Sequence, residues 1–208
     1  MNKFSKLKVA LSLAKPGWEA QKKLASIGYE DFRKPKPSSK VAAVLLLLVP
    51  NSNDSWDIIY IKRPSNNPHD KHGGQISFPG GRTEENDRSL EDTALRETEE
   101  EIGVPRTQIQ LLGSLSQVYV FVSDFIVSPY VAFCETLPEF ILQESEVAYV
   151  IRKDLKELLS TEILTKDLPI RSTVLKNVPY YDLDGETLWG ATAMMTAEFL
   201  EIYRSILI

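Results

Sequence analysis

The stretch from Gly80 to Val104 constrains the fold of this 208-residue chain more than any other. It opens with a glycine pair, and Gly103 near its end predicts the C-terminus of a helix. Ser89, or Asp87 shortly before it, is suited to cap the start of that helix. One arc of the helix carries the apolar residues Leu90, Ala94, Leu95 and Ile102. We therefore predict a helix that packs one face against a core.

The last turns of this predicted helix carry an unusual density of acidic side chains. Four of the five residues from Glu97 to Glu101 are acidic, at the helix end where the macrodipole is already negative. Glu97, Glu100 and Glu101 stand at i, i+3 and i+4, so they project from one strip of the surface. Clustered carboxylates bind hard divalent cations, and a bound cation would remove the repulsion. We predict that these three residues hold Mg²⁺ or Mn²⁺; the alternative is a solvated acidic face.

These residues also resemble a known signature. The residues that carry the resemblance to the Nudix box are Gly81, Arg96-Glu97, Glu100-Glu101 and Gly103-Val104. The chain departs from the family pattern at Thr98, where an apolar residue is usual. It departs again at Asp87, which stands in place of a Glu and is separated from Arg96 by eight residues instead of seven. This Asp and the additional residue are similar to one branch of the family, the coenzyme A diphosphatases.

The resemblance implies a fold and an activity. The expected fold is α/β, a Nudix-type α/β/α sandwich with a curved mixed β-sheet. The expected activity is metal-dependent cleavage of the diphosphate of coenzyme A or acyl-CoA, giving 3′,5′-ADP and 4′-phosphopantetheine or its acylated form. Glu97 and Glu100 are the implied catalytic carboxylates, and Arg96 orients them through charge-assisted hydrogen bonds. The proton acceptor is left open among Glu97, Glu100 and Glu146.

Two other classes of function stay open. One is a Nudix hydrolase of a different nucleotide, such as ADP-ribose, NADH or a nucleoside triphosphate. The other is a nucleotide-binding module that keeps the fold without turnover, against which the three intact carboxylates argue. In each case the expected partner is a small nucleotide.

The segment from Arg63 to Gly81 is the second informative stretch. A loop of this length without secondary structure is uncommon unless it is functional, although a plain connector is the alternative. Its side chains and glycine amides are suited to a phosphorylated ligand, and the predicted substrate-binding residues are Arg63, His72, Gln75, Gly80 and Gly81. His72-Gly73-Gly74-Gln75 resembles the signature that precedes the Nudix box in coenzyme A diphosphatases. Taken singly, His72 and His69 would be interpreted as surface residues.

The resemblance covers most of the chain from Val41 to Ile208. Glu146-Val147-Ala148 is similar to the same branch, and Glu146 is interpreted either as a solvated carboxylate or as an additional ligand or base. The stretch from Leu188 to Ala193 is similar as well, and we expect Trp189 and Gly190 to serve packing and the start of a helix. At the other end, the stretch from Pro16 to Ala20 is similar more faintly.

Residues 1–37 are predicted to form a helical appendage with a linker, and residues 38–208 the Nudix domain. The appendage should hold helices Lys3–Leu13 and Gly17–Ile27. The expected strands are Val41–Val49, Trp56–Lys62, Ile109–Val122, Phe125–Cys134, Val147–Ile151 and Val178–Leu183. The other expected helices are Asp154–Leu159 and Leu188–Ser205. Pro129 predicts an edge position or a bulge in its strand.

Composition limits the partners. A net charge of −5 argues against nucleic acid or an anionic membrane as a general partner. No apolar run is long enough to span a membrane, and we expect a cytoplasmic protein. The single cysteine, Cys134, lies in an apolar run and is interpreted as a buried structural thiol. The oligomeric state is left open, with a homodimer as one option.

Overall fold

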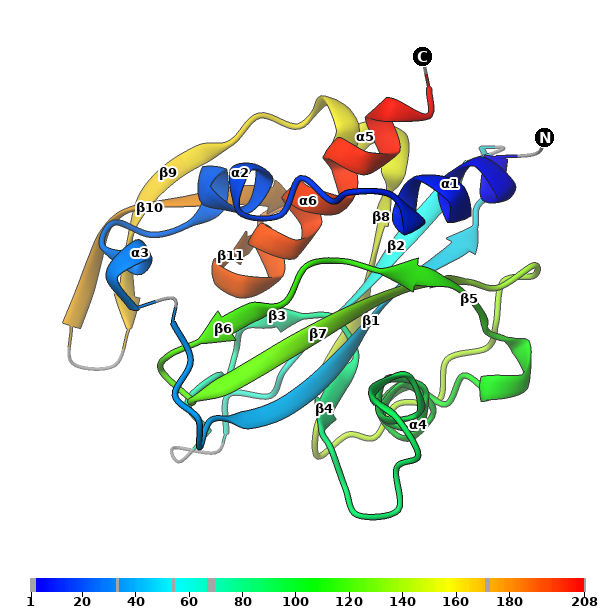
Figure 1. Cartoon of the computed structure of the whole chain (residues 1–208), viewed down its shortest axis with the longest axis horizontal. Coiled ribbons are helices and arrows are strands. Elements are labelled where there is room, and N and C mark those ends of the chain that lie inside the picture. Colours follow the sequence, from blue (N-terminus) through cyan, green and yellow to red (C-terminus); the bar gives the residue numbers. More distant parts are fainter. Residues whose placement is uncertain (1–2, 33, 54, 67–69, 171–172, 208) are drawn as a thin grey trace.

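The computed structural model describes residues 3–32, 34–53, 55–66, 70–170 and 173–207, and a mixed β-sheet forms its centre (Figure 1). The central strand β1 (Lys40–Pro50) pairs in parallel with β7 (Phe125–Phe133) and antiparallel with β2 (Trp56–Lys62). The other strands of this sheet are β3 (Ile76–Ser77), β4 (Gly80–Arg82), β5 (Gln110–Ser114), β6 (Val118–Val120) and β8 (Tyr149–Asp154).

Helices cover both faces of this sheet (Figure 1). Helix α4 (Leu90–Ile102) packs on one face, while α1 (Lys3–Ser12) and α6 (Gly190–Ser205) pack on the other. The short helices are α2 (Trp18–Gln21), η1 (Lys22–Leu24), α3 (Tyr29–Phe32), η2 (Arg106–Gln108) and α5 (Leu155–Ser160). None of the helices in the described part of the chain combines the length and the apolar character that crossing a bilayer requires. The predicted α/β/α sandwich with a mixed sheet is confirmed.

Strand β1 explains why the sequence has a continuous apolar run at 41–49. Leu46 and Leu48 belong to the core that α1 and α6 cover, whereas Leu45 and Leu47 belong to the core beneath α4. Because successive side chains of a strand point to opposite faces, a strand covered on both faces is apolar throughout. The prediction of a buried central strand is confirmed.

Strand β7 excludes the edge position for Pro129 and agrees with the other alternative, a bulge. Between the pairs Ser114↔Tyr130 and Val118↔Val127, residues 115–117 stand opposite residues 128–129. Pro129 does not lie in an edge strand, because β7 is paired with β1 on one side and with β5 and β6 on the other. The proline is tolerated because its partner is interrupted between β5 and β6, where the N–H of Leu115 donates to the Pro129 carbonyl at 2.8 Å. Proline cannot return a hydrogen bond to the Leu115 carbonyl, which accepts from the Lys15 ammonium at 3.5 Å instead.

The C-terminal part differs from the expected strand and helix. A second, three-stranded antiparallel sheet is formed by β9 (Leu164–Ile170), β10 (Thr173–Leu183) and β11 (Glu186–Trp189). Leu188 and Trp189 belong to β11, so the expected helix Leu188–Ser205 was placed too early and begins at Gly190. Gly190 has φ +64, which favours glycine at the point where the strand turns into the helix.

The N-terminal segment is packed into the domain. Leu7 and Leu11 of α1 are buried in the same core as Phe199 of α6. The Gln21 amide donates to the fully buried Glu198 carboxylate at 2.8 Å. Whether residues 1–37 act as a separate appendage stays a prediction, which the contact between Gln21 and Glu198 makes testable.

Cys134 has the environment that its sequence context predicts. It is buried and free of any disulfide. Burial raises the pKa of the thiol to about 11, which keeps it protonated and unreactive at neutral pH. The interpretation as a structural thiol is confirmed.

Candidate active site

Helix α4 begins and ends as the sequence predicts. The Ser89 hydroxyl accepts a hydrogen bond from the Asp92 N–H at 3.1 Å and caps the start of the helix. Gly103 adopts φ +70 at the end, and its N–H donates to the Glu99 carbonyl at 3.0 Å. A β-carbon at Gly103 would lie 2.6 Å from Ile141, so the helix must end on glycine for the following chain to pass. These ends fix which way the acidic side chains point.

Three carboxylates converge at the C-terminal end of α4. Single oxygens of Glu97, Glu101 and Glu146 all lie within 4.8 Å of one another. Glu146 reaches this place because the preceding chain is bound to the end of the helix: the Gln143 N–H donates to the Glu101 carbonyl at 3.0 Å, and the Glu146 N–H donates to the Gln143 carbonyl at 2.9 Å. Below, these three residues are called the carboxylate cluster.

The glycine pair of β4 forms the floor under the cluster. The Gly80 N–H donates to the Glu101 carboxylate at 2.8 Å. Gly80 has φ +146, and a β-carbon there would lie 2.4 Å from the Ala43 carbonyl oxygen, so a side chain is excluded. A β-carbon at Gly81 would lie 2.6 Å from the Glu97 carboxylate. The two glycines therefore let β4 approach both β1 and the acidic side chains of α4.

The cluster concentrates negative charge at a site that is partly shielded from solvent. Glu101 is 1% exposed, and burial raises the pKa of its carboxyl group to about 8. Burial also raises the pKa of Glu97, and the neighbouring carboxylates act in the same direction. Arg63 approaches Glu101 with 3.9 Å between Nη1 and Oε1, which compensates one of these charges in part. Three converging carboxylates are oxygen donors of the kind that Mg²⁺ and Mn²⁺ prefer, so this donor set fits such a cation.

Arg96 links the helix to the loop before it. It donates to both oxygens of Asp87, at 2.8 and 3.0 Å, and to the Arg82 carbonyl at 3.1 Å. The Arg96 hydrogen bonds hold the pKa of Asp87 well below its usual range. Arg96 also contacts Glu97 at 3.0 Å and Glu100 at 2.9 Å. The Asp in place of the usual Glu thus serves to fix the arginine that positions Glu97.

The structure does not place every predicted residue of the acidic strip together. Glu97 and Glu101 lie in the cluster, but the Glu100 side chain is 57% exposed, is turned toward Arg96 and is not part of the cluster. Glu146, which the sequence left open, takes the third place. Helical spacing and the resemblance to the Nudix box both suggested Glu100. Neither could reveal that Arg96 binds this side chain at 2.9 Å and holds it outside the cluster.

The loop between β2 and β3 is held by its own polar residues. Arg63 donates to Asp70 with two bonds of 3.2 Å, and its backbone N–H donates to the Gln75 carbonyl at 3.0 Å. The His72 ring nitrogen Nδ1 lies 3.1 Å from the Gln75 side-chain oxygen. Arg63 therefore lies between this loop and the carboxylate cluster, whereas His72 and Gln75 contact each other. His69 lies outside the described residues.

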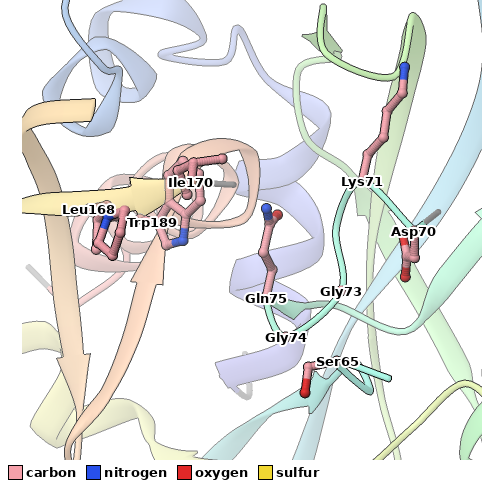
Figure 2. A pocket seen from close by; sticks show the side chains of 10 residues that line it. Ser65, Asp70, Lys71, Gly73, Gly74, Gln75, Leu168, Ile170 and Trp189 are labelled. Atoms are coloured by element: carbon pink, nitrogen blue, oxygen red, sulfur yellow. The ribbon is translucent and has the colours of Figure 1, made fainter. Parts of the chain in front are cut away.

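A cavity of about 420 Å³ adjoins this loop (Figure 2). One wall consists of loop residues, Ser65, Asp70, Lys71, Gly73, Gly74 and Gln75. The opposite wall comes from the second sheet and consists of Leu168, Pro169, Ile170 and Trp189. The sequence indicated Gln75 as a ligand residue, but it assigned Trp189 to packing and gave no signal for the β9 residues.

Comparison with known proteins places this geometry in a family. Residues 39–170 match the NUDIX domain family. The chain belongs to the Nudix family. The uncharacterized Nudix hydrolase NudL of Pectobacterium atrosepticum is 36% identical over 126 residues, which are 59% of this chain and 64% of that protein. NudL of Yersinia pestis strain Pestoides F is 34% identical over 124 residues, which are 59% of this chain and 61% of that protein.

The matched segments thus span less than two thirds of the length of these NudL relatives.

Two solved structures are similar in fold. The Nudix hydrolase RenU from M. smegmatis has a TM-score of 0.54 at 14% identity, covering 81% of this chain and 86% of its own. A MutT/nudix family protein from Enterococcus faecalis has a TM-score of 0.51 at 19% identity, covering 94% of this chain and 76% of its own. At these identities the likeness concerns the Nudix fold alone.

Proposed function

We propose that this Nudix chain is a metal-dependent hydrolase that cleaves the diphosphate of coenzyme A or acyl-CoA. The observation that carries the proposal is the carboxylate cluster, in which Glu97, Glu101 and Glu146 converge within 4.8 Å beside the glycine pair. A chain selected only for folding gains nothing from bringing these like charges together at the negative end of a helix. The arrangement is useful when a cation and an anionic substrate meet there.

The chemistry assigned to the site is attack of water on one phosphorus of the diphosphate. The P–O bond to the bridging oxygen breaks, and the water proton passes to a carboxylate of the protein. Glu97, Glu101 and Glu146 would hold Mg²⁺ or Mn²⁺, whose charge would offset that of the diphosphate and make water a better nucleophile. Arg96 keeps Glu97 in place, and Gly80 keeps Glu101 in place through its N–H. The Arg63 guanidinium group lies beside the cluster, 3.9 Å from Glu101.

The choice of coenzyme A rests on the loop before the glycine pair. The His72-Gly73-Gly74-Gln75 motif resembles the coenzyme A diphosphatase signature, and the same residues lie at or beside the cavity. A substrate with its diphosphate at the cluster would extend one arm toward that cavity. Such contacts away from the scissile bond can be used to position the reacting centre.

A substrate panel tests the proposal. The purified full-length chain is incubated with Mg²⁺ or Mn²⁺ and with coenzyme A, acetyl-CoA, ADP-ribose, NADH or ATP, and the products are separated by chromatography. We expect coenzyme A to give 3′,5′-ADP and 4′-phosphopantetheine, with a kcat/KM above that for the other nucleotides. A higher kcat/KM for ADP-ribose would refute the branch and keep the Nudix activity. Absence of cleavage of every substrate would favour the binding module.

Two substitutions test whether Glu146 or Glu100 is the third carboxylate of the metal site. We expect Glu146→Gln to lower turnover by at least about 10-fold, because it removes a member of the cluster. Glu100→Gln, at the exposed position beside Arg96, should lower turnover less. Titration of Mn²⁺ then separates the roles: a ligand loses metal affinity when it is changed, whereas a proton acceptor loses kcat and keeps metal affinity. A larger loss for Glu100→Gln than for Glu146→Gln would contradict the assignment.

A further inference from the structure

The cavity beside the 65–75 loop has two walls of opposite character. The loop side offers polar groups, including the Ser65 hydroxyl and the Gln75 amide. The other side offers Leu168 and Ile170 from β9 and Trp189 from β11. In Figure 2 the Gln75 side chain projects from the loop into the space that Trp189 and Ile170 border. At about 420 Å³, the cavity falls within the size range of sites for small organic ligands.

The second sheet is fixed to the first close to this cavity. Glu186, at the start of β11, accepts from the Lys62 ammonium at 2.7 Å at the end of β2. The Tyr149 hydroxyl of β8 donates to the same carboxylate. The Lys62 and Glu186 side chains are partly buried, whereas Tyr149 is exposed. Trp189 follows on the same strand, so the apolar wall is held at a fixed place relative to the loop.

Arg63 connects the cavity to the carboxylate cluster. Its guanidinium group bonds to Asp70, which lines the cavity, and lies 3.9 Å from Glu101. Its backbone N–H donates to Gln75, which also lines the cavity. A diphosphate bound at the cluster therefore has this cavity within reach of one of its two substituents.

The charges at the cavity decide which substituent fits. Lys71 is the one cation among the described residues that line it, and its ammonium donates to the Val122 carbonyl at 2.9 Å. Figure 2 shows this side chain extending away from Trp189. The Arg63 guanidinium group is already paired with the Asp70 carboxylate, so this pair offers little attraction to an added phosphate group. An arm that carries a phosphate is therefore disfavoured, whereas an uncharged arm with amide groups can pair with Gln75 and pack its methylene groups on Trp189.

We propose that this cavity receives the uncharged, amide-bearing arm of the substrate, and that Trp189 and Leu168 determine specificity for that arm. The inference rests on the proposed function, because it takes the pantetheine arm of coenzyme A as the occupant. It assigns recognition to the second sheet, which provides one wall of the cavity and no member of the carboxylate cluster.

Binding of the two halves of the substrate tests the assignment without turnover. Isothermal titration calorimetry on the full-length chain uses 4′-phosphopantetheine and, separately, 3′,5′-ADP. We expect Leu168→Ala and Trp189→Ala each to weaken binding of 4′-phosphopantetheine by about 10-fold, the effect of losing a well-packed apolar contact in a ligand site. Binding of 3′,5′-ADP should change by less than about twofold, because neither of its two phosphate groups is expected to enter the cavity.

Controls separate recognition from folding. Leu164→Ala changes the same residue type on the same strand, at an exposed position outside the cavity, and should leave both affinities unchanged. Thermal melts show whether Trp189→Ala is folded. Leu168 is only partly buried, so its substitution keeps the test valid if Trp189→Ala unfolds.

Three outcomes would overturn the inference: a loss confined to 3′,5′-ADP, unchanged affinity for both half-ligands in both variants, or a parent chain that binds neither. These results are distinct from the hydrolysis assay. A parent that cleaves coenzyme A while Leu168→Ala leaves 4′-phosphopantetheine affinity intact refutes the inference alone. Binding that depends on Leu168, in a chain that cleaves none of the panel substrates, supports the inference and refutes the hydrolase.

Discussion

Replacing Glu101 with Gln should stabilise the chain when no divalent cation is present. Glu101 is 1% exposed, and its carboxylate lies within 4.8 Å of those of Glu97 and Glu146. Glutamine has the same shape, and its carbonyl oxygen can still accept the Gly80 N–H that now bonds to Glu101 at 2.8 Å. Because the pKa of Glu101 is raised to about 8, its carboxyl group at neutral pH either bears a charge beside the other carboxylates or takes up a proton, and both cost stability. Glutamine avoids both costs and keeps the local packing.

The size of the effect follows from the geometry. At an effective dielectric constant of about 20, two like charges 4.8 Å apart repel by about 3 kcal/mol. Arg63, at 3.9 Å from Glu101, offsets a similar amount, and solvent screens the exposed Glu146. We expect the free energy of unfolding to rise by about 1–2 kcal/mol, which for a chain of this size raises Tm by about 2–8 °C.

Calorimetric melts in chelator and in Mn²⁺ measure both parts of this prediction. At a Mn²⁺ concentration of 100 times its Kd, the parent should gain about 2.7 kcal/mol, and Glu101→Gln should gain much less. Glu144→Gln, an exposed carboxylate near Glu146 but outside the cluster, is the matched control and should behave as the parent. A Glu101→Gln variant that is less stable than the parent in chelator, or that gains as much from Mn²⁺, would refute the reasoning.

Two further substitutions test the glycine beside the carboxylate cluster and the packing of the N-terminal segment. Gly81→Ala places a β-carbon 2.6 Å from the Glu97 carboxylate, so we expect kcat/KM to fall by at least about 10-fold while Tm changes little, since the flexible end of Glu97 can move aside; parental kcat/KM would contradict this. Gln21→Leu removes the side-chain partner of the fully buried Glu198, so unfolding in urea should show a loss of about 1–3 kcal/mol. Lys22→Ala, at an exposed ion pair, is its control, and an unchanged midpoint for Gln21→Leu would favour a separate appendage.

The features that the sequence predicted well are governed by nearby residues. Ser89 and Gly103 fix the ends of α4 through hydrogen bonds within a few residues of each end. The apolar run of β1 similarly reflects burial on both faces of one strand. In such cases the residue types and their spacing contain the physical cause of the structure, so local rules are sufficient.

The membership of the carboxylate cluster could be predicted only in part, because it depends on a distant contact. Helical periodicity places Glu97, Glu100 and Glu101 near one another, and it is correct for the backbone. The side-chain arrangement is decided by Arg96, which binds Glu100 outside the cluster, and by the Gln143 N–H, which holds the chain of Glu146 against the end of α4. The hydrogen bond from Gln143 to Glu101 connects two segments that are far apart in the sequence, and no rule of residue spacing predicts such a contact.

The apolar wall of the cavity could not be predicted from the sequence, for a different reason. Strand β9 contains Lys166, Asp167 and Pro169, and all of its residues are exposed or half-buried, so it lacks the apolar alternation that reveals a strand. It exists because β10 pairs with it, and it lies beside the loop because Glu186 bonds to Lys62. Trp189 consequently has two roles that the sequence could not separate, ending β11 before α6 and lining the cavity. A cavity built between two sheets depends on how the sheets are joined, and only the three-dimensional structure contains that information.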